Sequence, residues 1–352
     1  MTQPAAFSWH GRRVFLTGHT GFKGGWLALW LASKGAIVRG YALDPCTEPN
    51  LFTAARIGSV IEDIRGDIRN QSTLEPALKD FAPEVVFHLA AQPLVRFSYA
   101  DPIGTYETNV IGTARVLDAI RRTPSVRAVV SVTTDKCYEN IEDPHRAYKE
   151  TDPLGGYDPY SSSKACLELV VSAYRRSFFC AAEAPRLATA RTGNVIGGGD
   201  WGPGRLVPDA VRAVEQQLTL RVRQPGAVRP WQHVLNPLAG YLRLSQALWH
   251  DAGAARAWNF GPAADDARPV SWIVERLGEL WGGELRWELD QQEAAPEIAG
   301  VALDCSAAER ELQWRPRLSL QDALALVVEW HRAQRAGRDM RAVSLSQIAR
   351  FS

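Results

Sequence analysis

The first two hundred positions alternate short β-branched and apolar runs with segments of helical periodicity. In the segment 22–33, Trp26, Trp30 and Leu31 fall on one helix face. The run 85–90 is apolar almost throughout, as in a strand that is buried on both faces. Strands are expected at 14–17, 37–43, 62–65, 85–90, 128–134 and 187–192, and helices at 22–33, 71–80, 105–122 and 161–179.

This alternation predicts an α/β fold, a doubly wound parallel sheet of Rossmann type with right-handed crossovers. A different α/β arrangement, such as a closed barrel, is the alternative. The regularity stops after Gly193, and nine of the 12 tryptophans lie between Trp201 and Trp330, so we expect a smaller, mixed α/β substrate-binding domain there. The expected partition is 1–192 plus about 231–261 for the Rossmann-type domain, 193–230 plus 262–335 for the smaller domain, and 336–352 for a loosely ordered basic tail.

Composition and charge narrow the class of function. Lys and Arg number 40 against 39 Asp and Glu, a net charge of +1, so nothing favours nucleic acid or an anionic membrane as a partner. No apolar run reaches the length of about 18 residues that a membrane span needs, and the first residues lack the apolar core of a signal peptide. The five cysteines show no C-x-x-C spacing. We therefore expect neither disulfides nor a metal site, and a reducing cytoplasm as the location.

A glycine motif follows the first expected strand. Its pattern is G-x-x-G-x-x-G at a strand-to-helix turn. Glycine lets backbone N–H groups approach a pyrophosphate, whose charge is favoured by the helix N-terminus. An ordinary glycine-rich turn is the alternative. The candidate dinucleotide-binding residues of this loop are Gly18, Thr20, Gly21, Phe22, Lys23 and Gly24.

The ends of the second and third strands bear on which dinucleotide fits. Asp44 is placed to bind the ribose hydroxyls of NAD, although a role in a turn explains it equally well. Arg39 would suit the additional phosphate of NADP, but it lies inside the expected strand. Asp67 and Ile68 follow the third strand, where an adenine ring would be held. NAD is therefore the expected cofactor.

Two further motifs carry candidate acid–base chemistry, and each contains one of only six lysines in the chain. Tyr160 and Lys164 form Y-x-x-x-K, which puts both side chains on one helix face. We expect the Lys164 cation to lower the pKa of Tyr160, making it a base, and to hold the nicotinamide ribose. Thr134, Asp135 and Lys136 end another strand. There Thr134 can hydrogen-bond a substrate hydroxyl.

Burial would make Asp135 an acid by raising its pKa, and a lowered pKa would make Lys136 a base. A solvated Asp–Lys pair in a loop is the alternative interpretation. A bare Y-x-x-x-K also occurs often by chance. Its distance from the glycine motif is what favours a functional role here.

Several longer sequence segments indicate which protein family the chain resembles. They are TGHTGFKGGW (17–26), IEDIRGDI (61–68), HLAAQPLVR (88–96), TDKCY (134–138), GGYDPYSSSK (155–164), GNVIGGGDW (193–201) and RPWQHVL (229–235). Together they resemble the nucleotide-sugar 4,6-dehydratases of the extended short-chain dehydrogenase/reductase superfamily, over roughly residues 11–335. Lys136 stands where the branch acting on dTDP-glucose carries Glu, and it resembles the CDP-glucose branch in this respect.

The resemblance implies that CDP-glucose is dehydrated to its 4-keto-6-deoxy product, with NAD+ used and regenerated. In that scheme Tyr160 removes the proton of the C4 hydroxyl, Asp135 protonates the departing C6 hydroxyl, and Lys136 is the candidate for taking the C5 proton. The resemblance adds Leu89, Ala90 and Ala91 to the cofactor-binding candidates. The candidate substrate-binding residues are Gln92, Arg96, Asn194, Arg205, Arg229 and Trp231. Guanidinium groups match phosphate oxygens, so the two later arginines are candidates for the pyrophosphate.

Two other interpretations stay open. A related epimerase would use Tyr160 and Lys164 but would not need an acid at Asp135. A non-catalytic dinucleotide-binding relative would have no use for that acid either. The resemblance also implies a homodimer through helices near 105–122 and 161–179, and leaves a tetramer open.

Overall fold

The fold is built on a parallel sheet, seen in a computed structural model that describes residues 7–139, 146–283, 285–290 and 302–352. The strands are β1 (Arg13–Thr17), β2 (Ile37–Ala42), β3 (Glu62–Arg65), β4 (Val85–His88), β5 (Ala128–Val132), β7 (Arg186–Arg191) and β12 (Ala257–Asn259). Their order is β12-β7-β5-β4-β1-β2-β3, and all neighbours are parallel. The predicted doubly wound sheet is confirmed.

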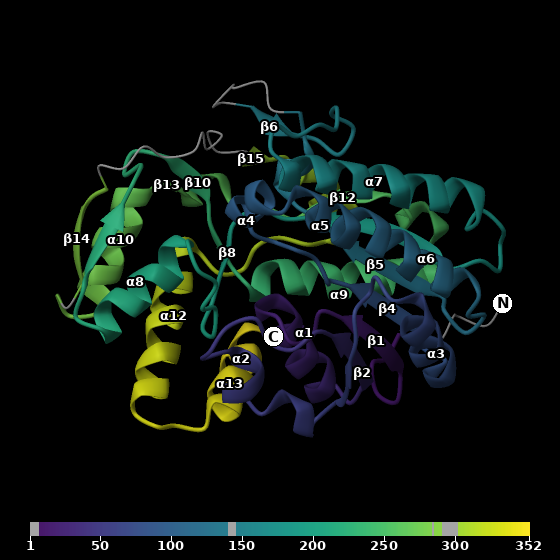
Figure 1. Cartoon of the computed structure of the whole chain (residues 1–352), viewed down its shortest axis with the longest axis horizontal. Coiled ribbons are helices and arrows are strands. Elements are labelled where there is room, and N and C mark those ends of the chain that lie inside the picture. Colours follow the sequence, from purple (N-terminus) through teal and green to yellow (C-terminus); the bar gives the residue numbers. More distant parts are fainter. Residues whose placement is uncertain (1–6, 140–145, 284, 291–301) are drawn as a thin grey trace.

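Alternate side chains of each strand enter two different cores, because successive residues of a strand point to opposite faces. The helices around the sheet are α1 (Phe22–Ser33), α3 (Gln71–Phe81), α4 (Val95–Ala100), α5 (Pro102–Tyr106), α6 (Thr113–Arg121), α7 (Pro159–Ser177) and α9 (Leu235–His250). Val14 and Leu16 belong to the core that includes α1 and α9. Phe15 belongs to the core that includes α3, α6 and α7. Figure 1 shows α5, α6 and α7 together along one side of the molecule.

A smaller unit with its own apolar core lies at the other end of the molecule (Figure 1). It consists of α8 (Leu206–Glu215), β9 (Thr219–Val222), β10 (Val228–Pro230), β13 (Ala267–Pro269), α10 (Val270–Leu280), β14 (Arg286–Leu289) and α12 (Leu320–Arg335). β9 pairs with β14 in parallel, and β10 pairs with β13 antiparallel. Val211, Ile273 and Val327 are buried together in its core. This unit closes one side of the cavity described below.

The remaining described elements are short. They are α2 (Leu51–Ala54), β6 (Ala147–Tyr148), β8 (Val195–Ile196), β11 (Gln232–His233), β15 (Ala302–Leu303) and α11 (Ser306–Leu312), with 3-10 turns at Ile57–Ser59, Asp135–Cys137, Ala252–Ala254 and Ala264–Asp266. β8 pairs with β11, and β6 with β15. No helix in the described part of the chain is long and apolar enough to cross a membrane.

Three features differ from the sequence-based expectations. The tail is not loosely ordered: it forms α13 (Met340–Phe351), which packs against α1 and α12 and buries Ile348 and Phe351. The helix expected at 105–122 is interrupted by a π-helical turn, Glu107–Gly112. The segment with α11 and Trp314 packs in the core beside the large sheet, although we expected it in the smaller unit.

Candidate active site

A cavity of about 640 Å³ runs along the carboxyl ends of the sheet strands and on to the smaller unit. Ligands of doubly wound sheets bind at this edge, where the strand order changes direction. Every cofactor-binding and catalytic residue proposed from the sequence lines this cavity. Among the six substrate candidates, Arg96, Asn194, Arg205, Arg229 and Trp231 line it as well.

The glycine loop forms one wall of the cavity and fits a dinucleotide pyrophosphate. Gly18 has φ +80°, and a Cβ there would lie 2.7 Å from the backbone N of Ala90. A Cβ on Gly24 would lie 2.1 Å from the backbone O of Gly18. Helix α1 begins here with Gly21 as N-cap and no side-chain cap, so its first N–H groups are left for an anionic ligand.

The ribose end of this wall favours NAD over NADP. Asp44 lines the cavity with a side chain that is 89% exposed, and its partner is Arg65 at 3.5 Å. Arg39, the candidate for a 2′-phosphate, instead pairs with Glu62 at 2.7 Å and donates to the backbone O of Ala77. Because these contacts hold Arg39 away from the cavity, a second phosphate would find no support from this residue.

Asp135 is held as a buried acid at the end of β5. It is 5% exposed, and its carboxylate accepts a hydrogen bond from the Thr134 hydroxyl at 2.9 Å. Burial raises the pKa of Asp135, while the charge of Lys136 and the bond with Thr134 partly oppose that rise. A Cβ on Gly193 would lie 2.9 Å from the Asp135 carboxylate, so the glycine leaves the room that the acid needs. The side chain is therefore suited to donate a proton.

Tyr160 and Lys164 both lie in the cavity. Burial raises the pKa of Tyr160 to about 12, opposed by its hydrogen bond with Thr134 and by the charge of Arg205. Burial also lowers the pKa of Lys164 to about 8. Arg205 is the cation whose charge is seen to lower the pKa of the phenol in this structure. The effect expected from Lys164 stays a prediction.

Lys136 is less buried than its neighbour Asp135. It follows Asp135 in the 3-10 turn, lines the cavity and is only partly buried. A lysine becomes a neutral base when desolvation is strong. The Lys136 side chain supplies a positive charge next to the Asp135 acid.

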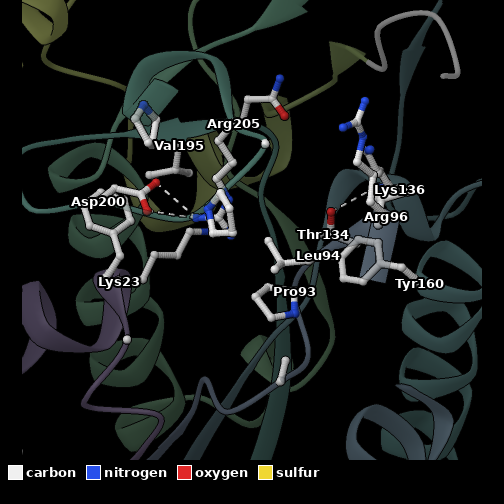
Figure 2. Close-up of a pocket in the computed structure, with 18 of the residues that line it drawn as sticks. Lys23, Pro93, Leu94, Arg96, Thr134, Lys136, Tyr160, Val195, Asp200 and Arg205 are labelled. Carbon is white, nitrogen blue, oxygen red and sulfur yellow. Dashed lines mark hydrogen bonds and ion pairs between the residues drawn. The ribbon is translucent and has the colours of Figure 1, made fainter. Parts of the chain in front are cut away.

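Charged side chains of the loop 200–205 and of the glycine loop meet on the cavity wall that faces the candidate catalytic residues (Figure 2). Arg205 donates to both oxygens of Asp200, at 3.2 and 3.0 Å. Lys23 reaches toward this pair, while Thr134, Lys136 and Tyr160 lie across the cavity (Figure 2). Burial, together with the charges of Arg205 and Lys164, lowers the pKa of Lys23 to about 7. This wall can hold anionic ligand groups.

Gln92 is the one substrate candidate that the structure does not place in the cavity. Its carboxamide donates to the backbone O of Leu94 at 3.1 Å and to the Thr105 hydroxyl at 3.0 Å. Its oxygen accepts from the N–H of Leu94 at 2.5 Å. The Gln92 side chain thus makes its hydrogen bonds within and beside the loop that carries Arg96, and a contact with the sugar stays a prediction.

Several polar residues around the site were missed from the sequence. Asn109, in the π-helical turn, bridges the backbone of Gln92 and the Ser163 hydroxyl, the latter at 2.8 Å. Glu168 and Arg191 form a buried pair at 2.9 Å. Glu168 lies at Lys164 + 4, so helical spacing was the signal that could have found it.

The family model that matches this chain and two of the curated proteins similar to it are described as 4,6-dehydratases. The model of the family described as GDP-mannose 4,6 dehydratase matches residues 15–327. A CDP-glucose 4,6-dehydratase of Salmonella typhimurium is 48% identical over 97% of this chain and 97% of that protein. A dTDP-glucose 4,6-dehydratase of Streptomyces antibioticus is 30% identical over 81% of this chain and 82% of that protein.

A solved structure similar to this chain is also that of a 4,6-dehydratase. DesIV, a dTDP-glucose 4,6-dehydratase of Streptomyces venezuelae solved with NAD bound, superposes with a TM-score of 0.78. The match has 26% identity and covers 94% of this chain and 99% of that one. The chain therefore belongs to the GDP-mannose 4,6 dehydratase family, whose members similar to it are nucleotide-sugar 4,6-dehydratases of the extended short-chain dehydrogenase/reductase type.

Proposed function

We propose that the protein is a hydro-lyase that converts CDP-D-glucose to CDP-4-keto-6-deoxy-D-glucose. The observation that carries this proposal is the buried acid Asp135, which shares one cavity with Tyr160, Lys164 and the glycine loop. An epimerase needs the tyrosine and the cofactor but no acid for a leaving hydroxyl. The choice of CDP-glucose rests on the 48% identity to the Salmonella enzyme.

The residues of the glycine-loop wall fit NAD and would hold it there. Gly18, Gly21 and Gly24 leave room for its pyrophosphate, Asp44 faces its ribose end, and Lys164 would hold the nicotinamide ribose. Bound in this cavity, NAD+ would supply a hydride acceptor for C4 of the sugar, a hydride donor for C6 and an additional positive charge. Because the hydride is returned, the reaction has no net oxidation.

The protein groups supply the proton transfers. Tyr160 takes the proton of the C4 hydroxyl, with Thr134 hydrogen-bonded to the phenol oxygen. A ketone at C4 makes the C5 proton acidic. Lys136, which lines the cavity, is the candidate base that takes this proton, and its removal expels the C6 hydroxyl. Asp135, kept protonated by burial, gives its proton to that hydroxyl, which leaves as water. Arg205 and Arg229 are placed on the cavity wall to bind the pyrophosphate of the substrate.

A direct assay tests this function. The protein is incubated with NAD+ and CDP-glucose, dTDP-glucose, UDP-glucose or GDP-mannose in turn, and the 4-keto product is measured by its ultraviolet absorbance in alkali. We expect product with CDP-glucose at a kcat/KM at least about tenfold above the others. Product from another nucleotide sugar alone would overturn the substrate, and no product from any would favour the non-catalytic interpretation.

We propose that the working form is a homodimer through α5, α6 and α7. α5 packs beside α7, and exposed apolar side chains lie on α5 (Ile103, 68% exposed), on the π-helical turn (Ile111) and on α7 (Leu169, 60% exposed). Covering such a patch with a second copy would remove apolar area from water. A cytoplasmic location is also proposed, supported by the free and exposed thiols of Cys46 and Cys180.

A further inference from the structure

A buried ion pair lies behind the catalytic side chains. Glu168 on α7 and Arg191 at the end of β7 have side chains that are each 4% exposed. Arg191 donates through Nε and Nη2 to the two carboxylate oxygens, at 2.9 and 3.0 Å. The hydroxyls of Thr133 and Thr189 donate to the same two oxygens, at 2.6 and 2.8 Å. Such complete hydrogen bonding is what a buried charged pair needs to offset its desolvation.

The pair connects the segments that carry the proposed chemistry. On α7, Glu168 follows Lys164 by four residues and Tyr160 by eight, so the three lie along one helix face. On β5, Thr133 directly precedes Thr134 and Asp135 in the chain. The Thr133 hydroxyl is therefore a direct link from the carboxylate on the helix to the strand end that presents the acid.

The Arg191 guanidinium is also held by hydrogen bonds to groups other than Glu168. Arg191 Nη1 donates to the Tyr138 hydroxyl at 2.8 Å and to the backbone O of Glu150 at 3.0 Å. The Tyr138 hydroxyl donates to the Asn259 carboxamide oxygen at 2.7 Å. One residue after Arg191 in the adjacent loop, the backbone O of Thr192 accepts from the N–H of Asp135 at 3.2 Å. The guanidinium thus has partners on several elements and little freedom to move.

We propose that Glu168 and Arg191 are positioning residues of the dehydration reaction, which hold Tyr160 and Lys164 in register with Thr134 and Asp135 through the Thr133 hydroxyl. The proposal rests on the proposed function, because the groups being aligned are those of the proton transfers. Neither Glu168 nor Arg191 lines the cavity, so neither touches the substrate.

The negative charge of Glu168 also supports a positioning role, because it acts on Lys164. Burial lowers the pKa of Lys164, and the negative charge of the Glu168 carboxylate opposes this lowering. His88 and Lys23 also interact with the Lys164 cation. Burial alone would raise the pKa of Glu168, but Arg191 and the threonine hydroxyls together hold it below its ordinary value. A permanently ionised Glu168 therefore favours the ammonium form of Lys164.

Two threonines provide a matched experiment. Thr133 and Thr189 are both buried, and each gives Glu168 one hydroxyl hydrogen bond. Thr133→Val and Thr189→Val each remove one donor from the carboxylate while leaving the ion pair intact, so both variants are expected to fold with similar losses in Tm. Only Thr133 adjoins the catalytic strand end. Thr133→Ser keeps the hydroxyl and serves as the conservative rescue.

Steady-state kinetics with CDP-glucose give the first readout. We expect Thr133→Val to lower kcat about tenfold or more, with KM changed less than about threefold, because alignment of reacting groups is lost rather than substrate binding. Thr189→Val and Thr133→Ser are expected to stay within about threefold of wild-type kcat. Equal kcat values for Thr133→Val and Thr189→Val would overturn the proposal.

Hydrogen–deuterium exchange gives a readout that needs no turnover. Thr133→Val is expected to speed amide exchange in peptides covering 133–138 and 160–168, and Thr189→Val is expected to leave them unchanged. Equal exchange in the two variants contradicts positioning even where the wild-type protein turns over no CDP-glucose. A wild type without product, paired with different exchange in the two variants, instead means that the substrate assignment failed and the positioning role stands.

Discussion

Asp135 is the residue on which the distinction between a dehydratase and an epimerase depends. Asp135→Asn keeps the shape of the side chain but cannot give a proton to the C6 hydroxyl. We expect kcat for 4-keto product to fall by about 10²–10⁴, the usual worth of a general acid. The fall is measured by the alkaline absorbance assay with CDP-glucose.

The control for this prediction is Asp80→Asn, which removes an exposed carboxylate on α3. It should leave the rate unchanged. Because C4 oxidation precedes the step that needs the acid, Asp135→Asn should still produce the absorbance of reduced nicotinamide when CDP-glucose is added. Wild-type product formation by Asp135→Asn would remove the acid from the mechanism.

Lys136 has an effect on Asp135 whose sign can be tested. The Lys136 charge lowers the pKa of Asp135, opposing the larger rise that burial causes. The acid works in its protonated form, so the rate declines as pH rises through the pKa of Asp135. Removing the charge in Lys136→Met should raise that pKa and move the alkaline limb of the pH–rate profile to higher pH. The profile of kcat against pH is the measurement.

Lys149→Met is the matched control, because this lysine is exposed and does not act on the Asp135 carboxyl. It should reproduce the wild-type profile. A limb that moves to lower pH in Lys136→Met would contradict the assigned charge effect. Loss of turnover at every pH would instead make Lys136 the base that takes the C5 proton.

Elements with strong periodicity were predictable, and those that depend on distant contacts were not. The pattern at 22–33 gives α1 with its observed bounds, because Trp26, Trp30 and Leu31 are buried against the sheet. Helix α13 was missed because its arginines suggested a solvated tail. Arg341 in fact donates to the backbone O of Ala55 at 3.0 Å, a contact that no local pattern reveals.

The same contrast holds for the site. Residues that follow strand ends, such as Asp135 and Asn194, were predictable because a parallel sheet gathers these ends at one edge. Gln92 also follows a strand end, but its side chain turns into its own loop. Glu168 and Arg191 were invisible as a pair because their contact joins a helix to a strand 23 residues later.

Helix α13 is expected to stabilise the large domain without taking part in catalysis. Phe351 is 7% exposed and meets the Trp30 ring edge-on, with centroids 5.5 Å apart. Phe351→Ala should reduce the free energy of unfolding by about 3 kcal/mol, the lower end of the range for a buried phenylalanine, because the chain end can relax. Chemical denaturation measures the change.

Arg350→Ala is the companion variant for α13. Arg350 pairs with Glu329 at 2.5 Å at the surface, where both side chains are about half exposed, so its loss should cost less than about 1 kcal/mol. Both variants should keep wild-type kcat at temperatures where they are folded. Equal destabilisation by the two changes would show that the buried ring does not anchor the helix.

At the scale of the whole molecule, each of the two units carries an exposed leucine that can test where a second copy of the chain binds. Leu169 on α7 is 60% exposed, and α7 packs against α5 and the π-helical turn, which also carry exposed apolar side chains, whereas Leu289 on β14 is 56% exposed on the smaller unit. Their similar exposure makes them a matched pair. A charge at an interface between identical copies is placed twice and desolvated on association, so it opposes dimer formation strongly.

We therefore expect Leu169→Glu to convert a dimer of the wild-type chain to a monomer, and Leu289→Glu to leave the dimer intact. Sedimentation velocity at micromolar protein measures both, and circular dichroism checks that the fold is kept. Because α7 also carries Tyr160 and Lys164 on its inner face, a Leu169→Glu monomer should lose part of its kcat as the helix loses its outer support. A wild-type monomer, or a dimer that survives Leu169→Glu and dissociates with Leu289→Glu, would place the interface elsewhere.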